Sequence, residues 1–222
     1  MTDAVILQTY VGPVTLSDGS HDSRVRQNNM GDLLVSKGLP DQYEQVLRGN
    51  AFVYSTPAAG AALVAPTTTN APMIWNPSGS GKNLVIEKIA LGYVGTTWAP
   101  GFVEYGVLTN AGSQIGTGAP VVSLTQVAGV NRLIGGGNAT VMRFAPTTLV
   151  LIAAPTFLCP SGFSAVTGTA AAVLNPYTLV DNIDGGIIIP PGVAFFVMAN
   201  AAIAGVVATA IYGLELPIAP TA

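Results

Sequence analysis

The sequence predicts an all-β protein: a β-sandwich or jelly roll preceded by an extended polar N-terminal arm that contains one short helix. The 26 glycines and 16 prolines are scattered through the 222 residues, which leaves few windows long enough for an average helix. Short apolar, β-branched segments recur between these turn residues. Helices do not alternate with them, as a parallel α/β sheet would require.

The arm is expected to comprise residues 1–50 and the sandwich residues 51–222. Turn-forming sequence is frequent in the arm, as in 17–20 and 27–32. Terminal segments of this kind are usually disordered unless something holds them in place. We expect the arm to be held in place, either along a neighbouring subunit or across its own domain.

The one helix of the arm is expected over residues 42–47. Asp41 can cap its N-terminus, and Glu44 has the spacing of a capping box. Gly49 follows the helix, at a position where glycine commonly ends one. The predicted helix is therefore less than two turns long.

In the sandwich, strands are expected where a short apolar run is bounded by turn residues. The predicted strands are 51–55, 84–94, 102–108, 121–127, 141–144, 148–153, 186–189, 193–199 and 206–216. In the last strand, six side chains alternate so that they share one face: Val206, Ala208, Ala210, Tyr212, Leu214 and Leu216.

Residues 193–214 are uncharged and long enough to span a bilayer, which takes about 20 apolar residues. Two strands are favoured instead, because Pro190-Pro191-Gly192 precedes the segment, Asn200 interrupts it and no Lys or Arg flanks it. We expect no membrane partner. The first residues, 1–4, lack the features of a secretory signal, so synthesis in the cytoplasm without export is expected.

Charged residues are scarce and unevenly placed. Only 9% of the residues are charged, roughly a third of the usual fraction for a soluble domain. Ten of the 19 charged residues (8 basic, 11 acidic) lie in residues 1–50, and none occurs from Phe144 to Val180. Charge repulsion, which keeps monomers apart, is therefore missing there. We expect much of this surface to be buried against other subunits.

Two further features of the composition concern nucleic-acid binding and disulfide formation. The net charge is −3, the pI is about 4.9 and the basic residues do not cluster, so nucleic-acid binding is not expected. Cys159 is the only cysteine and cannot form a disulfide within the chain. It is expected to be a buried, inert thiol.

Residues 76–83, Asn-Pro-Ser-Gly-Ser-Gly-Lys-Asn, superficially resemble a phosphate-binding loop. That pattern requires glycine at 76 and Ser or Thr at 83, and both positions are asparagine. A strand pattern follows, where the motif would need a helix. We therefore predict a hairpin turn and no bound cofactor.

Catalytic side chains are few. His21 is the only histidine, so a catalytic triad or a zinc site would depend on one loop residue, and we expect His21 to be a solvated or capping side chain. Three glutamates, Glu87, Glu104 and Glu215, lie inside strand patterns and are weak candidates for a glycosidase pair. We predict no catalytic, cofactor-binding or metal-binding residue. We also expect that the protein is not an enzyme and has no small-molecule substrate.

Asp181 and Asp184 lie three residues apart in 181–186 and leave two alternatives open. They are expected to form a tight turn that enters the strand 187–189. The other alternative is a structural cation held by their carboxylates, although the full EF-hand pattern is missing.

The aromatic side chains of the first half are expected to pack in the core. Trp98 is the one with an alternative, because a turn at 98–101 could expose it as an anchor for a partner. The aromatic residues concerned are Tyr43, Phe52, Tyr54, Trp75, Trp98, Phe102 and Tyr105.

Three segments carry a resemblance to a known group of proteins. Residues 43–52 (YEQVLRGNAF) and 75–86 (WNPSGSGKNLVI) resemble structural proteins of tailed bacteriophages. Residues 184–193 (DGGIIIPPGV), followed by a final strand that ends in Glu215, look like the closing hairpin of phage β-sandwich proteins. Counted through Glu215, these segments cover about a quarter of the chain.

The resemblance implies a virion component with a jelly roll or related sandwich, often trimeric. It implies a capsid decoration (cement) protein on the head surface, with the major capsid protein or other virion proteins as partners. The alternative is a tail fibre or other appendage that recognises the host surface through loops such as 95–101 and 112–120. The resemblance supplies no catalytic residues.

Overall fold

The computed structural model describes residues 42–70, 72–95, 101–109, 127–136, 138–147, 149–165, 179–200 and 206–218. Contacts divide the chain into two units, Met1–Tyr43 and Glu44–Ala222, so most of the short helix belongs with the sandwich. Four sequence-based predictions lie outside the described residues. They are the arm up to Asp41, the strand at 121–126, the loop residues 96–100 and the loop 112–120.

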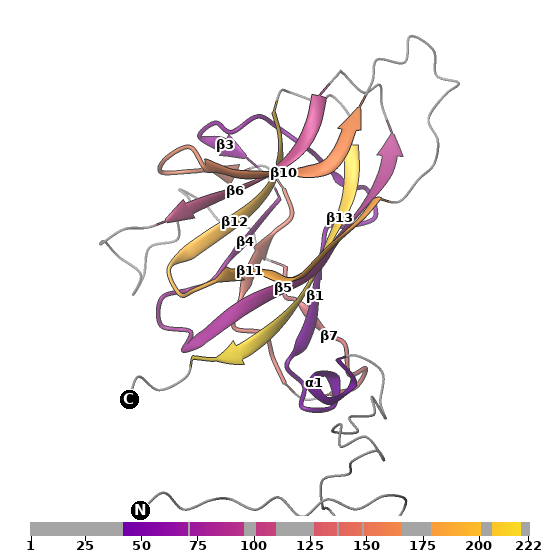
Figure 1. Cartoon of the computed structure of the whole chain (residues 1–222), viewed down its shortest axis with the longest axis vertical. Helices are drawn as coiled ribbons and strands as arrows, with labels where there is room; N and C mark the ends of the chain where they lie inside the picture. Colours follow the sequence, from indigo (N-terminus) through magenta and orange to yellow (C-terminus); the bar gives the residue numbers. More distant parts are fainter. Residues whose placement is uncertain are drawn as a thin grey trace, which may run out of the picture. The chain divides into compact units, whose positions relative to one another are not determined.

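In chain order the elements are α1 (Tyr43–Leu47), β1 (Ala51–Ser55), β2 (Ala61–Ala62), β3 (Thr69–Asn70), β4 (Met73–Trp75), β5 (Lys82–Gly95), β6 (Gly101–Thr109), β7 (Val130–Asn131), β8 (Arg143–Ala145), β9 (Leu149–Val150), β10 (Thr156–Ala165), β11 (Leu179–Ile189), β12 (Val193–Ala199) and β13 (Val206–Pro217). The larger sheet has the order β11-β5-β13-β1-β7, with β2 also paired to β13 (Figure 1). The smaller sheet has the order β10-β6-β12-β4-β8, and β3 pairs with β9.

The strand order is that of a jelly roll. Eight strands carry it: β1, β4, β5, β6, β10, β11, β12 and β13. Numbered one to eight along the chain, they are ordered 6-3-8-1 in the larger sheet and 5-4-7-2 in the smaller one. Apart from β6 and β10, successive strands lie in opposite sheets, which is the double Greek-key winding of a jelly roll. The predicted all-β sandwich is confirmed.

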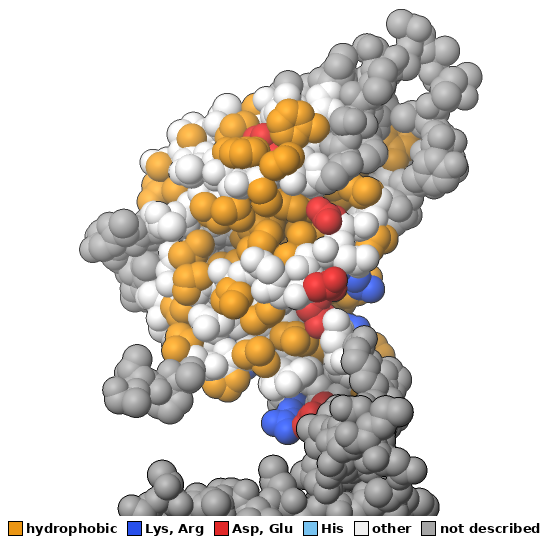
Figure 2. Space-filling model, in the orientation of Figure 1, with side chains coloured by type: hydrophobic (Ala, Val, Ile, Leu, Met, Phe, Trp, Pro, Cys, Tyr) orange, Lys and Arg blue, Asp and Glu red, His pale blue; other side chains and the backbone are white. Residues whose placement is uncertain are grey.

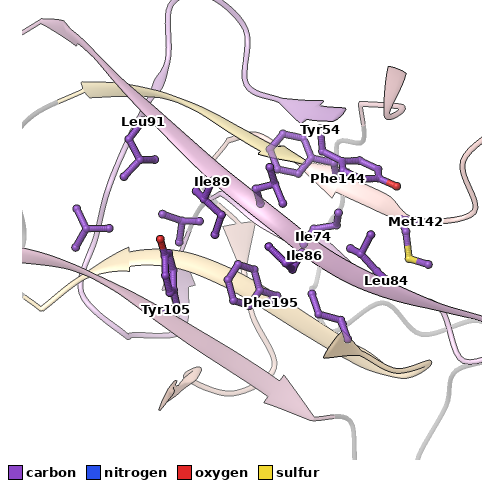
Figure 3. Packing of buried hydrophobic residues seen from close by; sticks show 14 of the residues in the cluster. Tyr54, Ile74, Leu84, Ile86, Ile89, Leu91, Tyr105, Met142, Phe144 and Phe195 are labelled. Atoms are coloured by element: carbon purple, nitrogen blue, oxygen red, sulfur yellow. The ribbon is translucent and has the colours of Figure 1, made fainter. Parts of the chain in front are cut away.

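The main core lies between the two sheets. Inward side chains of the larger sheet, such as Ile86 and Ile89, are fully buried against those of the smaller sheet, such as Phe195 and Tyr105 (Figure 3). The rings of Tyr105 and Phe195 lie 5.4 Å apart. Burial of this apolar surface is the main favourable contribution to folding.

The smaller sheet is buried on both faces. Along β12, Phe195 and Val197 belong to the core between the sheets, whereas Phe196 and Met198 belong to a second cluster on the opposite face. This explains why 193–199 is an unbroken apolar run and does not alternate with polar residues. The predicted bounds of this strand agree with β12.

The final strand alternates as predicted, but its uniformly apolar face is the outer one. Val206, Ala208 and the side chains that share their face are half-buried. The opposite, fully buried face is formed by Val207, Thr209, Ile211, Gly213 and Glu215. The inner face of β13 therefore carries the polar residues, and its outer face is apolar.

The prediction of a tight turn at 181–186 is wrong. These residues lie within β11, where the pairing with β5 shifts register between Asn182 and Ile187. The four residues 183–186 are opposite Glu87 alone, so the extra chain forms a bulge, with positive φ at Asp184 (48°) and Gly185 (81°). The strand therefore begins at Leu179, seven residues before the predicted start.

Two predicted hairpins are inter-sheet connections. The turn at 76–83 joins β4 in the smaller sheet to β5 in the larger one, and no pairing links them. The segment 184–193 likewise leads from β11 into β12 of the other sheet. In a jelly roll, sequence-adjacent strands separated by a tight turn cross between sheets, so turn chemistry alone does not define a hairpin.

The short helix ends as predicted. Gly49 has a φ of 71°, its N–H donates to the carbonyl of Val46, and the N–H of Asn50 donates to the carbonyl of Gln45. These two bonds are those of a Schellman motif, which requires a residue such as glycine in the left-handed conformation. The helix begins at Tyr43, one residue after the predicted start.

Residues 193–214 form β12 and β13, as expected from the sequence. Within the described ranges, no helix has both the length and the apolarity needed to cross a bilayer.

The buried face of β13 should dominate stability. Replacing Ile211→Ala removes a fully buried side chain and should lower the free energy of unfolding by about 2–5 kcal/mol. The matched variant Ile134→Ala changes a side chain that is 87% exposed and should change it by less than about 0.5 kcal/mol. Urea unfolding followed by fluorescence measures both. Equal losses would contradict this core assignment.

Candidate interaction surfaces

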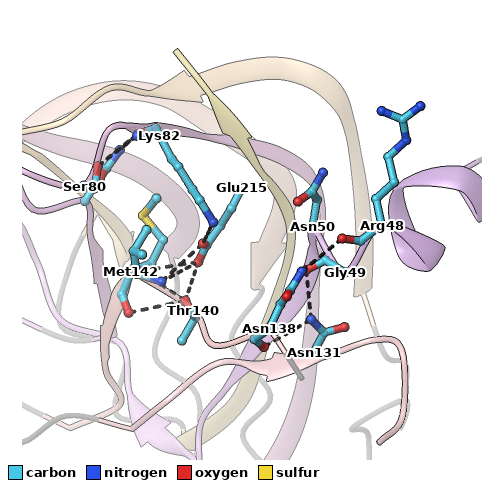
Figure 4. Close-up of polar contacts among 12 residues, drawn as sticks. Arg48, Gly49, Asn50, Ser80, Lys82, Asn131, Asn138, Thr140, Met142 and Glu215 are labelled. Atoms are coloured by element: carbon cyan, nitrogen blue, oxygen red, sulfur yellow. Dashed lines mark hydrogen bonds and ion pairs between the residues drawn. The ribbon is translucent and has the colours of Figure 1, made fainter. Parts of the chain in front are cut away.

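A buried carboxylate joins four distant segments of the sandwich. The Glu215 side chain on β13 (Figure 4) is fully buried, and its Oε1 accepts a hydrogen bond of 2.7 Å from the Tyr54 hydroxyl on β1. Its Oε2 lies 3.3 Å from Nζ of Lys82 at the start of β5. The hydroxyl of Thr140 also donates to Oε1. A buried carboxylate is tolerated because these donors replace its hydration.

The same carboxylate holds the segment between β7 and β8. Backbone N–H groups of Val141 and Met142 donate to it over 3.1 to 3.4 Å. The charge and burial of Glu215 also act on Tyr54: loss of hydration, then the nearby carboxylate, raise the pKa of its hydroxyl well above the usual range. Tyr54 therefore remains a neutral hydrogen-bond donor.

A second ion pair lies at Glu87 on β5, where the pairing of β5 with β13 shifts register. Nη1 of Arg132 is 2.9 Å from Oε2 of Glu87. Burial raises the pKa of the Glu87 carboxyl, although the Arg132 charge opposes the shift. Two cations lie over the Tyr212 ring in cation–π contacts. Nζ of Lys88 is 4.4 Å and the Arg132 guanidinium is 5.9 Å from the ring centre. These charges are thus held together on the outer face of the larger sheet.

Other charged side chains of the sandwich also contact neighbouring groups or are buried. The Arg143 guanidinium lies over the Trp75 ring at 5.6 Å. Asp181 accepts a hydrogen bond of 2.8 Å from the Tyr105 hydroxyl. Glu104 is 4% exposed, and burial raises the pKa of its carboxyl. The side chains of Glu104 and of the exposed Asp184, at the β11 bulge, make no hydrogen bond or ion pair among the described residues.

Exposed apolar side chains contrast with these internally held charges. Within the charge-free stretch from Phe144 to Val180, several large apolar residues are about half exposed: Val150 (50%), Ile152 (57%), Phe157 (50%), Leu158 (43%) and Val180 (48%). Figure 2 shows hydrophobic side chains spread widely over one face, where charged ones are few. Large exposed apolar areas commonly mark interaction sites.

Two hollows open on the described surface. One, of about 660 Å³, lies beside the Glu215 network and is lined by the turn at Ser80 and by Thr140 to Arg143. The other, of about 360 Å³, is an apolar groove between β10 and β11. Cys159 lines this groove and is only partly buried, whereas full burial was predicted. Partial burial, and then the charge of Asp181, raise the pKa of the thiol, which favours its protonated form.

The structure separates the side chains that could have formed a catalytic site. Glu87 and Glu215 are both engaged in ion pairs, and Glu104 faces the second apolar cluster, on the other side of the smaller sheet. His21 lies outside the described residues. The described ranges contain no group of three His, Cys, Asp or Glu side chains that could hold a metal ion, so Asp181 and Asp184 gain no further ligand there.

The aromatic predictions are confirmed for four residues. Phe52, Tyr54, Trp75 and Tyr105 are buried. Two differ: Phe102 is only partly buried, and Tyr43 is 43% exposed on the short helix. Trp98 lies outside the described residues, so its prediction stands as made.

Sequence reasoning missed Asn76. Its side chain is fully buried, and Nδ2 donates to the carbonyls of Lys82 (2.8 Å) and Ile189 (2.9 Å). It thereby ties together two inter-sheet connections. The only signal in the sequence was an asparagine before proline, which indicates a turn but not its neighbours.

Comparison with family models, with curated proteins and with solved structures finds no match for this chain.

The Glu215 network should be essential for stability. Glu215→Gln keeps the shape but removes the charge, which leaves Lys82 unpaired and places an amide donor among donors. The free energy of unfolding should fall by about 2 kcal/mol or more. The control Glu44→Gln breaks an exposed ion pair with Arg48 and should cost less than about 0.5 kcal/mol. Equal urea midpoints for both variants would contradict the network's role.

Glu104 should make stability depend on pH. Its folded-state pKa is raised above 4.5, so the stability it contributes is complete below that value and is lost as pH rises through the folded pKa. Glu104→Gln removes the titration. The stability of the variant relative to wild type should therefore increase between about pH 4 and pH 7. Parallel pH profiles from thermal unfolding would overturn this.

Proposed function

We propose that this protein is a virion structural protein, a capsid decoration protein that stabilises a phage head by binding the shell of the major capsid protein. The observation that carries the proposal is the surface. Nearly all charges of the sandwich are engaged internally, while apolar side chains from the stretch 144–180 are exposed. Such a surface favours permanent association with other proteins over a monomeric state.

The phage context comes from the sequence resemblance in 43–52, 75–86 and 184–193. The jelly-roll order is compatible with it, since viral capsid domains use this fold. Lectins and cupins use it too, so the fold by itself assigns no function. On a head, the apolar surface of each subunit would be buried against shell proteins, which contributes on the order of 25 cal/mol per Å² before the costs of association.

A substitution in the charge-free surface tests the proposal. Ile152→Asp places a charge at a side chain that is 57% exposed, and it should weaken binding to empty heads roughly tenfold or more because the charge would be desolvated at the contact. Ile134→Asp, at an 87% exposed position, is the matched control and should bind normally. Co-sedimentation with empty heads measures both.

Particle stability gives the second readout. Heads that lack the protein should rupture at lower temperature and under milder osmotic shock than complete heads. If they resist both equally well, the decoration role is wrong.

The alternative is a tail fibre or appendage that recognises the host surface. The hollow of about 660 Å³ favours it, because Ser80, Thr140 and Arg143 give this hollow polar and charged lining. Binding to a glycan array or to intact host cells, without binding to heads, would select this alternative.

A further inference from the structure

The groove of about 360 Å³ lies between the edge strands of the two sheets. β10 ends the order of the smaller sheet and β11 that of the larger one. The groove is lined by uncharged residues only: Val107, Leu158, Cys159, Gly186, Ile187, Ile188, Ile189 and Val193. Exposed apolar side chains flank it, with Phe157 at 50% and Ile188 at 56%. Its occupant should therefore be apolar and uncharged.

Backbone groups beside the groove favour a strand as the occupant. In the described part of the chain, β10 pairs only with β6, and β11 only with β5. The outer edges of both strands thus present N–H and C=O groups that an added strand can pair with. An extended segment gains affinity from these bonds and specificity from its alternate side chains.

The chain itself contains few candidates for this strand. Residues 121–126 lead into Val127, which bridges to Phe144 on β8, at the opposite edge of the smaller sheet. Residues 166–178 join Ala165 to Leu179, at the ends of β10 and β11 that are far from the groove. Residues 4–11 remain.

Residues 4–11 have the required chemistry. Their sequence, Ala-Val-Ile-Leu-Gln-Thr-Tyr-Val, is uncharged and rich in β-branched and aromatic residues, which favour strands. In an extended strand, Val5, Leu7 and Val11 point to the same side. The 30 residues from 12 to 41 can span up to about 100 Å, enough to reach another subunit.

We propose that residues 4–11 of one copy of this chain insert into the β10–β11 groove of a second copy and add a strand to its sandwich. The proposal rests on the proposed assembly role and specifies the contact between copies. Donation from each copy to the next, head to tail, makes a heterologous interface that closes into a ring or continues as a filament, whereas reciprocal exchange between two copies closes a dimer. A closed ring agrees with the trimer that the resemblance implies.

Cys159 provides a native reporter, because it lines the groove and is the only cysteine. In the full-length chain, Leu7→Cys should give intermolecular disulfides with Cys159 upon oxidation with copper phenanthroline, seen as a ladder on a non-reducing gel. Adding Cys159→Ser should abolish the ladder. Val5→Cys, on the same side of the strand, gives an independent second variant.

Two matched controls separate insertion from random collision. Gln8→Cys places the thiol on the opposite side of the strand, and Ser20→Cys places it in the polar part of the arm. Both should cross-link several-fold less than Leu7→Cys. Equal cross-linking in all variants, a link only within one chain, or no link in either Leu7→Cys or Val5→Cys would overturn the proposal. Normal head binding with no cross-link would reject strand donation and leave the decoration role standing.

Discussion

The carboxylate of Glu215 accepts hydrogen bonds from β1 and from the segment before β8, and it pairs with Lys82 at the start of β5. It lies on β13, the strand to which β5 is paired on one side and β1 on the other. The last strand of the chain is therefore a central strand of the larger sheet, and the sheet is incomplete until that strand is in place. A buried charge at its end makes misplacement costly, because the carboxylate would lose its donors.

Other charged side chains of the sandwich are also held by internal contacts, which leaves few charges free on the surface. Arg132 pairs with Glu87, Lys88 lies on Tyr212, Arg143 lies on Trp75 and Asp181 accepts from Tyr105. Few charges are left to repel other molecules, while half-exposed apolar residues such as Phe157 and Ile152 remain. The contacts that hold the charged side chains inside the sandwich therefore also leave a surface with few charges and exposed apolar side chains. This is why we interpret the protein as a component of an assembly.

Local pattern in the sequence was sufficient for β1, β5, β6, β12 and β13 and for the helix end, because apolar runs, turn residues and Gly49 act over a few positions. It did not predict β4 or β10, which lie where no strand was expected. It failed where the outcome depends on distant partners. The bulge at 183–186 is set by pairing with β5, and the turn at 76–83 crosses between sheets because β5 pairs with β13 and β11. Glu215 could be assigned to a strand, but neither its inward direction nor its donors, 73 to 161 residues away, are encoded locally.

We propose that this chain assembles with other subunits and does not exist as a free monomer. Light scattering of the full-length protein at micromolar concentration measures the mass of the particle in solution, which is then compared with the chain mass of 22.5 kDa. We expect a discrete mass several times that value, with three copies favoured by the phage resemblance. A stable, soluble particle of 22.5 kDa that does not bind empty heads would contradict it.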